Sequence, residues 1–425
     1  GLMDNSKAGL GALEFGSLTG IQTDIYQAAV WLRAAYSMER LARAMGEENL
    51  AARAGADFKK ASAAFEAKFW DAQGGRYSYG FSAEGKQVKE LTPWCAVPLI
   101  WNLGSKERAA QTLEKMSAAE LTTDWGVRIL SNKSPLYEPL NYNYGAVWPF
   151  LTGYVAMALY ANSCALQGYQ LLRANAEHVF DNSLGNATEL FSGSQHIWPQ
   201  EAVPHQGFSM GGFVLPFVRE LLGLEVNAVE KEITFKPSFP ADWPEVTVEN
   251  LKLGGEAFTL RFKRENGRLR LEVSGKPGLT SQMNFGPGLG LGTRVRSAKV
   301  NGRPINPSIE TSGQVTRPVV HFGLSGQDAV EIEFDPTVEV LPPVVESRVG
   351  DRDKGLKIIR LEREEKNLKL RVEGLAGGHY RLSLIHPELV AGVSGAELRD
   401  GCLEIQIPTG PPGQFLPHEI VVQTR

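Results

Sequence analysis

The 425-residue sequence has only three cysteines, and Cys95, Cys164 and Cys402 lie far apart. An odd number of separated cysteines supports neither a disulfide framework nor a Cys-x-x-Cys metal site, so we interpret them as buried thiols. No apolar run reaches about 18 residues, which excludes a transmembrane helix. The start lacks the basic and apolar regions of a signal peptide, although the sequence leaves open whether the protein is cytoplasmic or exported.

The sequence also has only a small excess of acidic over basic residues, because its net charge is −4, and it has no long run of Lys or Arg. The sequence therefore has no electrostatic footprint for nucleic acid or for an anionic membrane surface. These absences leave a neutral small molecule as the expected partner. At this length the chain is too long for one ordinary domain, and we expect two or three.

The first half of the sequence has a helical pattern, from Thr23 to about Leu224. After an expected N-cap at Thr23, apolar residues recur at helical spacing and form one stripe that ends at Gly46, with members Tyr26, Val30, Ala34, Met38, Leu41 and Met45. Further helices are expected at about 49–69, 93–103, 106–117, 146–163, 166–180 and 208–223. Long loops rich in Tyr, Trp, Gly and Pro connect them, which is typical of a helical solenoid or toroid with its site on the loops.

The second half changes to alternating patterns that predict strands and hairpins, such as the pair around Glu265-Asn266-Gly267. The Pro-rich stretch 336–348 is interpreted as a linker, and the hairpin pattern returns after residue 355. The predicted fold class is therefore multidomain α plus β. We expect a helical domain over 1–225, a β-sandwich over 226–340 and a C-terminal, Ig-like β-sandwich over 345–425.

The stretch from Asn141 to Gly212 combines helix starts crowded with aromatics and loops that carry isolated carboxylates and amides. Flat aromatic faces suit the C–H surfaces of a pyranose ring, and amides suit its hydroxyls. The candidate sugar-binding residues are Trp125, Asn141, Tyr142, Asn143, Tyr144, Trp148, Trp198, His205 and Gln206. For any single aromatic residue, core packing is the alternative.

Five segments in this order resemble the C-terminal glucosidase domain of glycogen-debranching enzymes, the amylo-α-1,6-glucosidases, within the six-hairpin glycosidases. They are Thr23–Trp31, Asp124–Ser131, Tyr142–Leu151, Glu189–Gly193, and Gln206–Ser209 with Leu221–Glu225. The resemblance covers about residues 1–275 and implies an (α/α)6 toroid. About five helices that precede the Met-Asp segment in that family are missing here. We therefore expect a partial toroid that an upstream segment or another chain completes.

The resemblance implies a catalytic pair of carboxyl groups. Asp4 follows Met3 at the position of the family's acid, although Leu2 stands where the family has tryptophan, and Glu189 occupies the position of the base. Glu201 is a rival base. The chemistry implied is inverting hydrolysis of α-linked glucosides or related oligosaccharides, in which one carboxyl protonates the leaving oxygen and the other activates water.

Each of these assignments has a non-catalytic alternative. Glu189 is otherwise a surface acid near a helix, Asp4 is otherwise a solvated acid at a chain end, and Glu14 and Asp24 are reserve acids. Asp24 suits a helix cap better than catalysis. In relatives a His-Gln or His-Asn pair stands at Asn143-Tyr144, which leaves the sugar open.

We expect no cofactor and no metal, since His196, His205 and Glu201 follow no established ligand spacing. The alternative function is a non-catalytic carbohydrate-binding or accessory fragment of a larger glycosidase, and a third is a sugar lyase. The lyase is disfavoured because no cluster of basic residues marks the loops.

Overall fold

The computed structural model describes residues 1–5, 12–14, 16, 18, 21–181, 184–198, 202–276 and 281–425. The chain forms two compact units. Unit 1 comprises residues 1–162, 170–214 and 345–359, and unit 2 comprises residues 163–169, 215–344 and 360–425. The mixed, multidomain α plus β class predicted from the sequence is confirmed, whereas the partial helical toroid stays a prediction. None of the described helices combines the length and the apolar character needed to span a membrane.

Most helices belong to unit 1. They are α1 (Ile25–Ala44), α2 (Glu48–Lys68), α3 (Val97–Ile100), which follows the 3-10 turn η1 (Pro93–Ala96), α4 (Lys106–Ser117) and α5 (Pro149–Ala161). Helix α6 (Ala165–Glu177) continues into η2 (His178–Phe180), and α7 (Gly207–Pro216) continues into a π-helical turn, η3 (Phe217–Leu221). Two-residue strands pair between them. β4 (Gly80–Phe81) pairs with β1 (Thr23–Asp24) on one side and with β5 (Gln87–Val88) on the other, β2 (Trp70–Asp71) pairs with β3 (Arg76–Tyr77), and β6 (Thr122–Thr123) pairs with β7 (Gly126–Val127).

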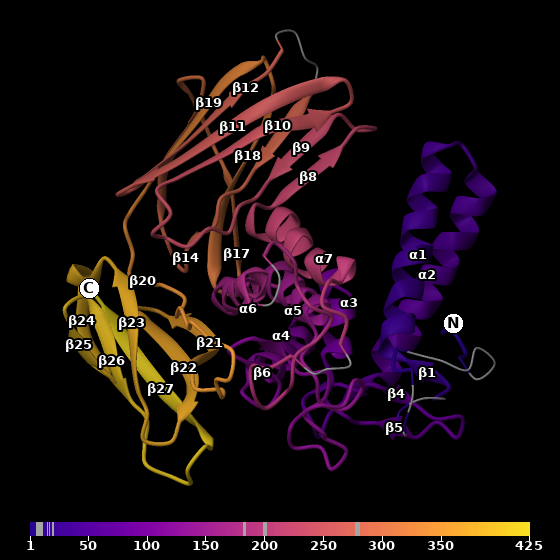
Figure 1. The fold of residues 1–425 in the computed structure, drawn as a ribbon. Helices are drawn as coiled ribbons and strands as arrows, with labels where there is room; N and C mark the ends of the chain where they lie inside the picture. The colour runs from indigo at the N-terminus through magenta and orange to yellow at the C-terminus, as the bar shows by residue number, and fades with distance from the viewer. Residues whose placement is uncertain are drawn as a thin grey trace. The chain divides into compact units, whose positions relative to one another are not determined.

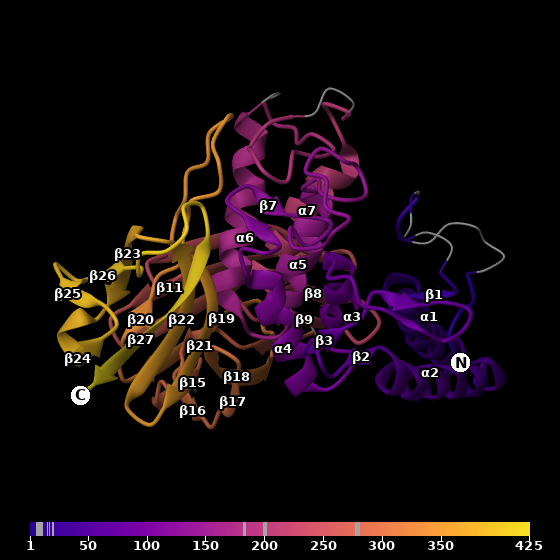
Figure 2. The same cartoon turned by 90° about the horizontal axis from the view of Figure 1, so that it is seen from below.

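Helices α1 and α2 lie side by side as an antiparallel pair (Figures 1 and 2). The apolar stripe expected on α1 does not form their contact, because Met38, Leu41 and Met45 are exposed. The buried face of α1 consists largely of alanines, with Ile25 and Leu32. The face of α2 that is buried carries Ala51, Ala54, Gly55 and Ala61. Small side chains allow closer helix packing, so this face is buried in place of the larger stripe.

Four larger sheets are built mostly from residues of unit 2. The first has the order β10 (Glu245–Leu253), β11 (Glu256–Glu265), β12 (Arg268–Ser274), β19 (Gln327–Phe334), β15 (Val295–Val300) and β16 (Arg303–Ile305). The second has the order β14 (Leu289–Gly290), β18 (Val315–Gly323), β13 (Gln282–Phe285), β9 (Glu232–Phe235) and β8 (Leu224–Asn227), with β17 (Ser308–Ser312) also paired to β18.

The other two sheets have four strands each. One has the order β20 (Glu339–Val340), β23 (His379–Ile385), β26 (Cys402–Gln406) and β25 (Glu397–Arg399). The other has the order β21 (Lys357–Glu364), β22 (Asn367–Leu375), β27 (Phe415–Thr424) and β24 (Val390–Ser394). A 3-10 turn, η4 (Pro387–Leu389), precedes β24.

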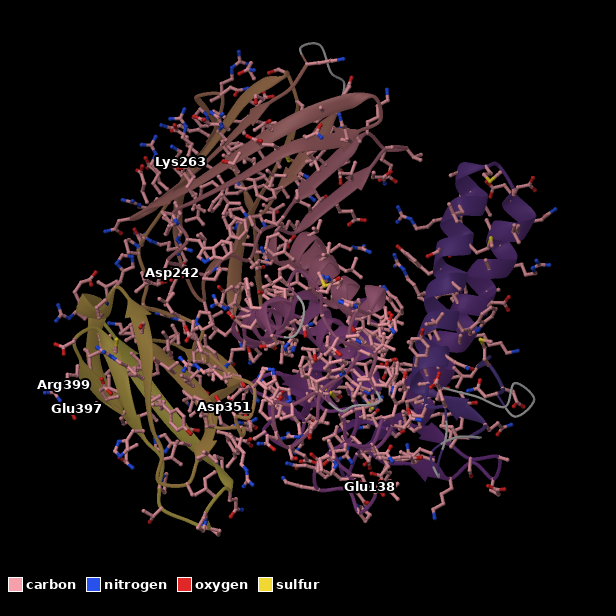
Figure 3. The ribbon with its side chains drawn as sticks, viewed as in Figure 1. Glu138, Asp242, Lys263, Asp351, Glu397 and Arg399 are labelled. Carbon is pink, nitrogen blue, oxygen red and sulfur yellow. The ribbon has the colours of Figure 1, made fainter. Side chains whose placement is uncertain are left out.

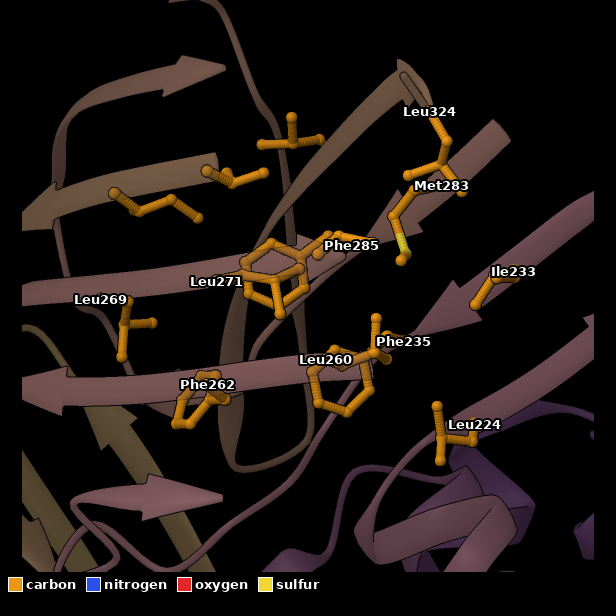
Figure 4. Packing of buried hydrophobic residues seen from close by; sticks show 14 of the residues in the cluster. Leu224, Ile233, Phe235, Leu260, Phe262, Leu269, Leu271, Met283, Phe285 and Leu324 are labelled. Carbon is orange, nitrogen blue, oxygen red and sulfur yellow. The ribbon is translucent and has the colours of Figure 1, made fainter. Parts of the chain in front are cut away.

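The β11–β12 hairpin forms where the alternating sequence predicts it. Glu265 pairs with Arg268 across the turn, and Gly267 adopts a φ of +72°, which glycine accommodates without strain. The inward residues of this hairpin pack against those of the second sheet in one core (Figure 4). Phe235 and Phe285 stack within that core with ring centroids 5.8 Å apart. The domain boundaries expected from the sequence stay predictions.

Candidate functional site

Glu189 is buried in the segment between η2 and α7, with 7% of its surface exposed. The Tyr142 hydroxyl donates to Glu189 Oε1 at 2.8 Å, and the Val203 amide donates to Oε2 at 3.2 Å. The backbone around it is also fixed, since the Glu189 amide donates to the Val203 carbonyl and Phe191 exchanges two hydrogen bonds with Val147. Both carboxylate oxygens therefore have defined directions, which is unusual for a merely solvated surface acid.

Tyr142 and Trp148 form an aromatic wall beside this carboxylate. Their ring centroids are 4.4 Å apart in an edge-on arrangement, and Trp148 Nε1 donates to the Tyr142 carbonyl at 2.9 Å. Burial, together with the neighbouring Glu189, raises the pKa of Tyr142, so the phenol remains a proton donor. Trp148 also stacks near-parallel on Phe208, which is 44% exposed. Phe208 thus leaves apolar surface exposed, and Trp148 links it to Tyr142, the residue that donates to Glu189.

Asp4 is exposed, and its neighbours are anchored to the start of α1. Gln22 Nε2 donates to Asp4 Oδ2 at 3.2 Å. The Thr23 hydroxyl donates to the Met3 carbonyl at 2.9 Å, and Asn5 Nδ2 donates to Asp24 Oδ2 at 2.7 Å. These bonds fix the chain on both sides of Asp4, while the Asp4 side chain itself is exposed.

Asp24 acts as the helix cap that the sequence favours, because its Oδ1 accepts from the Gln27 amide at 2.7 Å. The expected cap, Thr23, lies one position earlier, and its hydroxyl donates to the Met3 carbonyl instead. Burial raises the pKa of Asp24, and the hydrogen bonds from Gln27 and Asn5 oppose that rise. Asp24 therefore holds the Asp4 segment and the helix start together, which is a positioning role.

Glu14 is a second acid near the candidate base. Burial and Glu189 are the larger causes of the raised pKa of Tyr142, and the negative charge of Glu14 is the smallest. Nearby in the sequence, the Leu18 amide donates to the Tyr144 hydroxyl at 3.1 Å. Glu14, one of the reserve acids of the sequence analysis, therefore has an electrostatic effect on Tyr142.

Several other predicted residues serve the structure of the loops. Trp125 is 1% exposed, donates from Nε1 to the Ser192 carbonyl and stacks on His196, so it is enclosed by protein. Asn141 caps its own turn, since its Oδ1 accepts from two following amides and its Nδ2 donates to Glu138, which is labelled in Figure 3. Asn143 and Tyr144 are buried at 2% and 7% exposure.

The remaining predicted residues lie toward α7. Trp198 is 38% exposed, and its Nε1 donates to the Ala202 carbonyl at 2.9 Å. His205 is exposed, and at the start of α7 the Gln206 amide donates to the Ala187 carbonyl. Glu201, the rival base, lies outside the described residues.

The structure thus brings Tyr142, Trp148 and Glu189 together from the predicted set. It adds Phe150 and Phe208, which sequence reasoning missed. Phe150 meets Trp148 and Phe208 at centroid distances of 5.4 Å and 4.9 Å. Their position at the starts of two helices was a signal for both, but only tertiary packing shows that α5 and α7 place them side by side.

A buried ion network fixes the loop that begins at Asp124. Asp124 accepts from Lys357 Nζ at 2.5 Å and from the Lys354 and Gly355 amides. Lys357 also donates to Asp353 at 2.7 Å, and its side chain is 3% exposed. Burial opposes the ionisation of Asp124, but Lys357 and the amide bonds outweigh it and lower the pKa of Asp124 to about 2. Burial raises the pKa of Asp353 to about 6. The segment 345–359 is therefore tied into unit 1.

Comparison with known proteins gives a consistent picture. Residues 16–195, which include Glu189 but not Asp4, match the family model of the mannosylglycerate hydrolase MGH1-like glycoside hydrolase domain. The fold is similar to that of a sialidase, with a TM-score of 0.55 and 13% identity over 74% of this chain and 28% of that chain. A search of curated protein sequences finds no match.

Two further solved structures show weaker similarity. A GH63 mannosylglycerate hydrolase from Thermus thermophilus in complex with glucose has a TM-score of 0.39 and 18% identity, over 47% of this chain and 48% of that chain. An α-L-rhamnosidase from Dictyoglumus thermophilum has a TM-score of 0.48 and 14% identity, over 72% of this chain and 31% of that chain. The chain therefore spans less than half of each of these proteins.

The family match over residues 16–195 supports the class predicted from the sequence, that of a glycoside hydrolase. The narrower resemblance, to debranching enzymes, is not confirmed by the family match.

Among the described residues, His178, Asp181 and His196 form a cluster of potential metal ligands.

Proposed function

We propose that this chain carries the catalytic centre of an inverting glycoside hydrolase that acts on α-linked glucosides or related oligosaccharides. The observation that carries the proposal is the environment of Glu189. This carboxylate is buried, oriented by Tyr142 and by the Val203 amide, and bordered by aromatic rings, within a segment that matches a glycoside hydrolase domain. We also propose that the helices of unit 1 form part of an (α/α)6 toroid.

In the proposed mechanism Glu189 is the general base. Its ionised carboxylate takes a proton from water while that water attacks the anomeric carbon. The Tyr142 hydroxyl holds Oε1, so the other oxygen, Oε2, and its remaining lone pair are presented in a constant direction. Trp148 and Phe208 provide apolar ring surface for the sugar.

Asp4 is the proposed general acid, which protonates the departing glycosidic oxygen. Its segment is anchored through Thr23 and Asn5, yet Asp4 itself is exposed. An inverting enzyme separates its two carboxyl groups by about 6.5–9.5 Å to leave room for water. Glu14 is the competing acid, because its charge already reaches Tyr142.

The decisive experiment measures sugar release from α-linked gluco-oligosaccharides and from mannosylglycerate, which the matched family model names. We expect release by the wild type and a loss of at least about 1,000-fold in Glu189→Gln, because the amide cannot take up the proton. Proton NMR of the first product should show inverted anomeric configuration. Retained turnover in Glu189→Gln would refute its role as base.

A second substrate separates the two candidate acids. A glycosyl fluoride needs little protonation of its leaving group, so loss of the true acid should spare its hydrolysis and abolish that of the natural glycoside. We expect this pattern for Asp4→Asn and near wild-type behaviour for Glu14→Gln. The reverse pattern would assign the acid to Glu14.

The alternative function is carbohydrate binding without turnover, as an accessory part of a larger glycosidase. It predicts no release from any substrate and equal sugar affinity in the wild type and Glu189→Gln, measured by calorimetry. Sugar release and calorimetry together therefore decide between the two functions.

A further inference from the structure

His178, Asp181 and His196 form a buried cluster in unit 1. One nitrogen of each histidine and a carboxylate oxygen of Asp181 all lie within 4.8 Å of one another. His178 Nδ1 is 3.3 Å and His196 Nε2 is 3.0 Å from the same oxygen, Asp181 Oδ2. The histidine side chains are 0% and 1% exposed, and the Asp181 side chain is 13% exposed. Three ligand atoms thus point at one small region that protein encloses.

The hydrogen bonds of His178 leave a place suited to a cation beside its Nδ1. Its Nε2 lies 2.8 Å from the Trp125 carbonyl oxygen, which can only accept, so Nε2 carries a hydrogen. In a neutral imidazole Nδ1 is then an unprotonated acceptor, and it faces the Asp181 carboxylate, which is also an acceptor. A positive ion shared by Nδ1 and Asp181 resolves the conflict.

The outer nitrogens of both histidines are arranged as in metal sites. A ligating histidine usually donates its other N–H to a carbonyl, hydroxyl or carboxylate, which fixes the ring. Here His178 has the Trp125 carbonyl, and His196 Nδ1 lies 2.9 Å from the Ser347 hydroxyl. The His196 backbone is held as well, because its amide donates to the carbonyl of Asp351, labelled in Figure 3.

We propose that His178 Nδ1, His196 Nε2 and Asp181 Oδ2 bind a divalent transition-metal ion, with Zn²⁺ as the preferred ion. Two imidazoles and one carboxylate are typical zinc ligands. In a tetrahedral site with bonds of about 2.0–2.1 Å, ligand atoms lie about 3.3 Å apart. The two separations from Asp181 Oδ2 already have about this size.

The proposed ion has a structural role and takes no part in the proposed catalysis. It joins η2 to the segment that carries Glu189, which lies seven positions before His196 in the sequence. Through Trp125 and Ser347 it also connects the Asp124 loop and the segment 345–359. The site does not depend on the proposed glycosidase activity.

The first test is the metal content of the full chain, prepared without a histidine tag and dialysed, by inductively coupled plasma mass spectrometry. We expect close to one zinc per chain in the wild type. Asp181→Asn and His196→Asn should lose it, whereas His379→Asn, an exposed histidine in β23, should retain it. Zinc retained equally by all variants would overturn the proposal, because the ion would then bind elsewhere.

The second test uses only the wild type, so it does not depend on the folding of variants. Removal of metal with dipicolinate should lower the unfolding temperature by a few degrees, and added Zn²⁺ should restore it. Co²⁺ added to the metal-free chain should give the visible absorption of a tetrahedral site. An unfolding temperature that neither chelator nor Zn²⁺ changes, with no bound metal, would assign a proton to the position between His178 and Asp181 and overturn the proposal.

Discussion

Removal of Lys357 should destabilise unit 1. Its ammonium group lies between two buried carboxylates, at 2.5 Å from Asp124 and 2.7 Å from Asp353. The side chains of these carboxylates are only 1% and 8% exposed. Lys357→Met retains much of the length of the side chain and removes the charge, so two negative groups would remain in the interior without their shared cation.

The expected loss of unfolding free energy is about 3–5 kcal/mol, the usual cost when one partner of a buried ion pair is removed. Protonation of Asp353 in the variant sets an upper limit on this loss. From its ordinary pKa of 3.8, taking up a proton at pH 7 costs about 4 kcal/mol, at ~1.4 kcal/mol per pH unit. Asp124 keeps its hydrogen bonds from the Lys354 and Gly355 amides and can stay ionised.

The pH dependence provides a signature. In the wild type, burial raises the pKa of Asp353 to about 6, so the stability linked to its proton is present at low pH and lost as the pH rises through 6. In Lys357→Met that pKa rises further, and the variant gains more stability on acidification. The difference between variant and wild type should shrink by about 1 kcal/mol between about pH 7 and pH 5.

Urea unfolding followed by tryptophan fluorescence measures the unfolding free energy of unit 1, because every tryptophan except Trp243 lies in that unit. Lys354→Met is the matched control. Lys354 lies in the same segment, but its side chain is 54% exposed and pairs with Asp351, so we expect a loss below about 1 kcal/mol. Equal effects of the two substitutions, or a loss at Lys357 that does not change with pH, would refute the buried network.

Three further predictions concern packing, pH and activity. A Cβ at Gly212 would lie 2.5 Å from the Pro149 carbonyl oxygen, whereas a Cβ at Gly211 would meet nothing within 4 Å. Gly212→Ala should therefore cost about 1–3 kcal/mol in the same unfolding assay and Gly211→Ala nothing; equal effects would contradict this. Burial raises the pKa of Glu220 to about 7, so stability linked to its proton is lost between about pH 4.5 and 7. The unfolding free energy of Glu220→Gln should then exceed that of the wild type by up to about 3 kcal/mol at about pH 8 and equal it at about pH 4. A difference in unfolding free energy that does not change with pH would contradict this. Tyr142→Phe should lower kcat about tenfold with little change in KM, because one bond to the proposed base is lost; an unchanged kcat would contradict this.

Much of the secondary structure could be predicted from local patterns. The β11–β12 hairpin follows from alternation around Asn266-Gly267, and α4 and α5 begin and end within a few residues of their predicted limits. Local spacing did not decide which face of a helix is buried. On α1 both faces are apolar, and the alanine face is buried because α2 presents alanines and a glycine opposite it. That choice depends on the partner helix and not on the sequence of α1 alone.

The candidate site divides in the same way. The sequence by itself determined that carboxylates, aromatics and amides gather in the loops of a helical domain, because motifs such as Glu189-Leu-Phe-Ser-Gly are local. Only the tertiary structure decided that Tyr142 donates to Glu189, that Trp125 is packed against His196, and that Lys357 neutralises Asp124 across 233 positions of the chain. Hydrogen bonds, burial and charge pairing depend on distance in space, and a linear pattern carries no information about which distant segments meet.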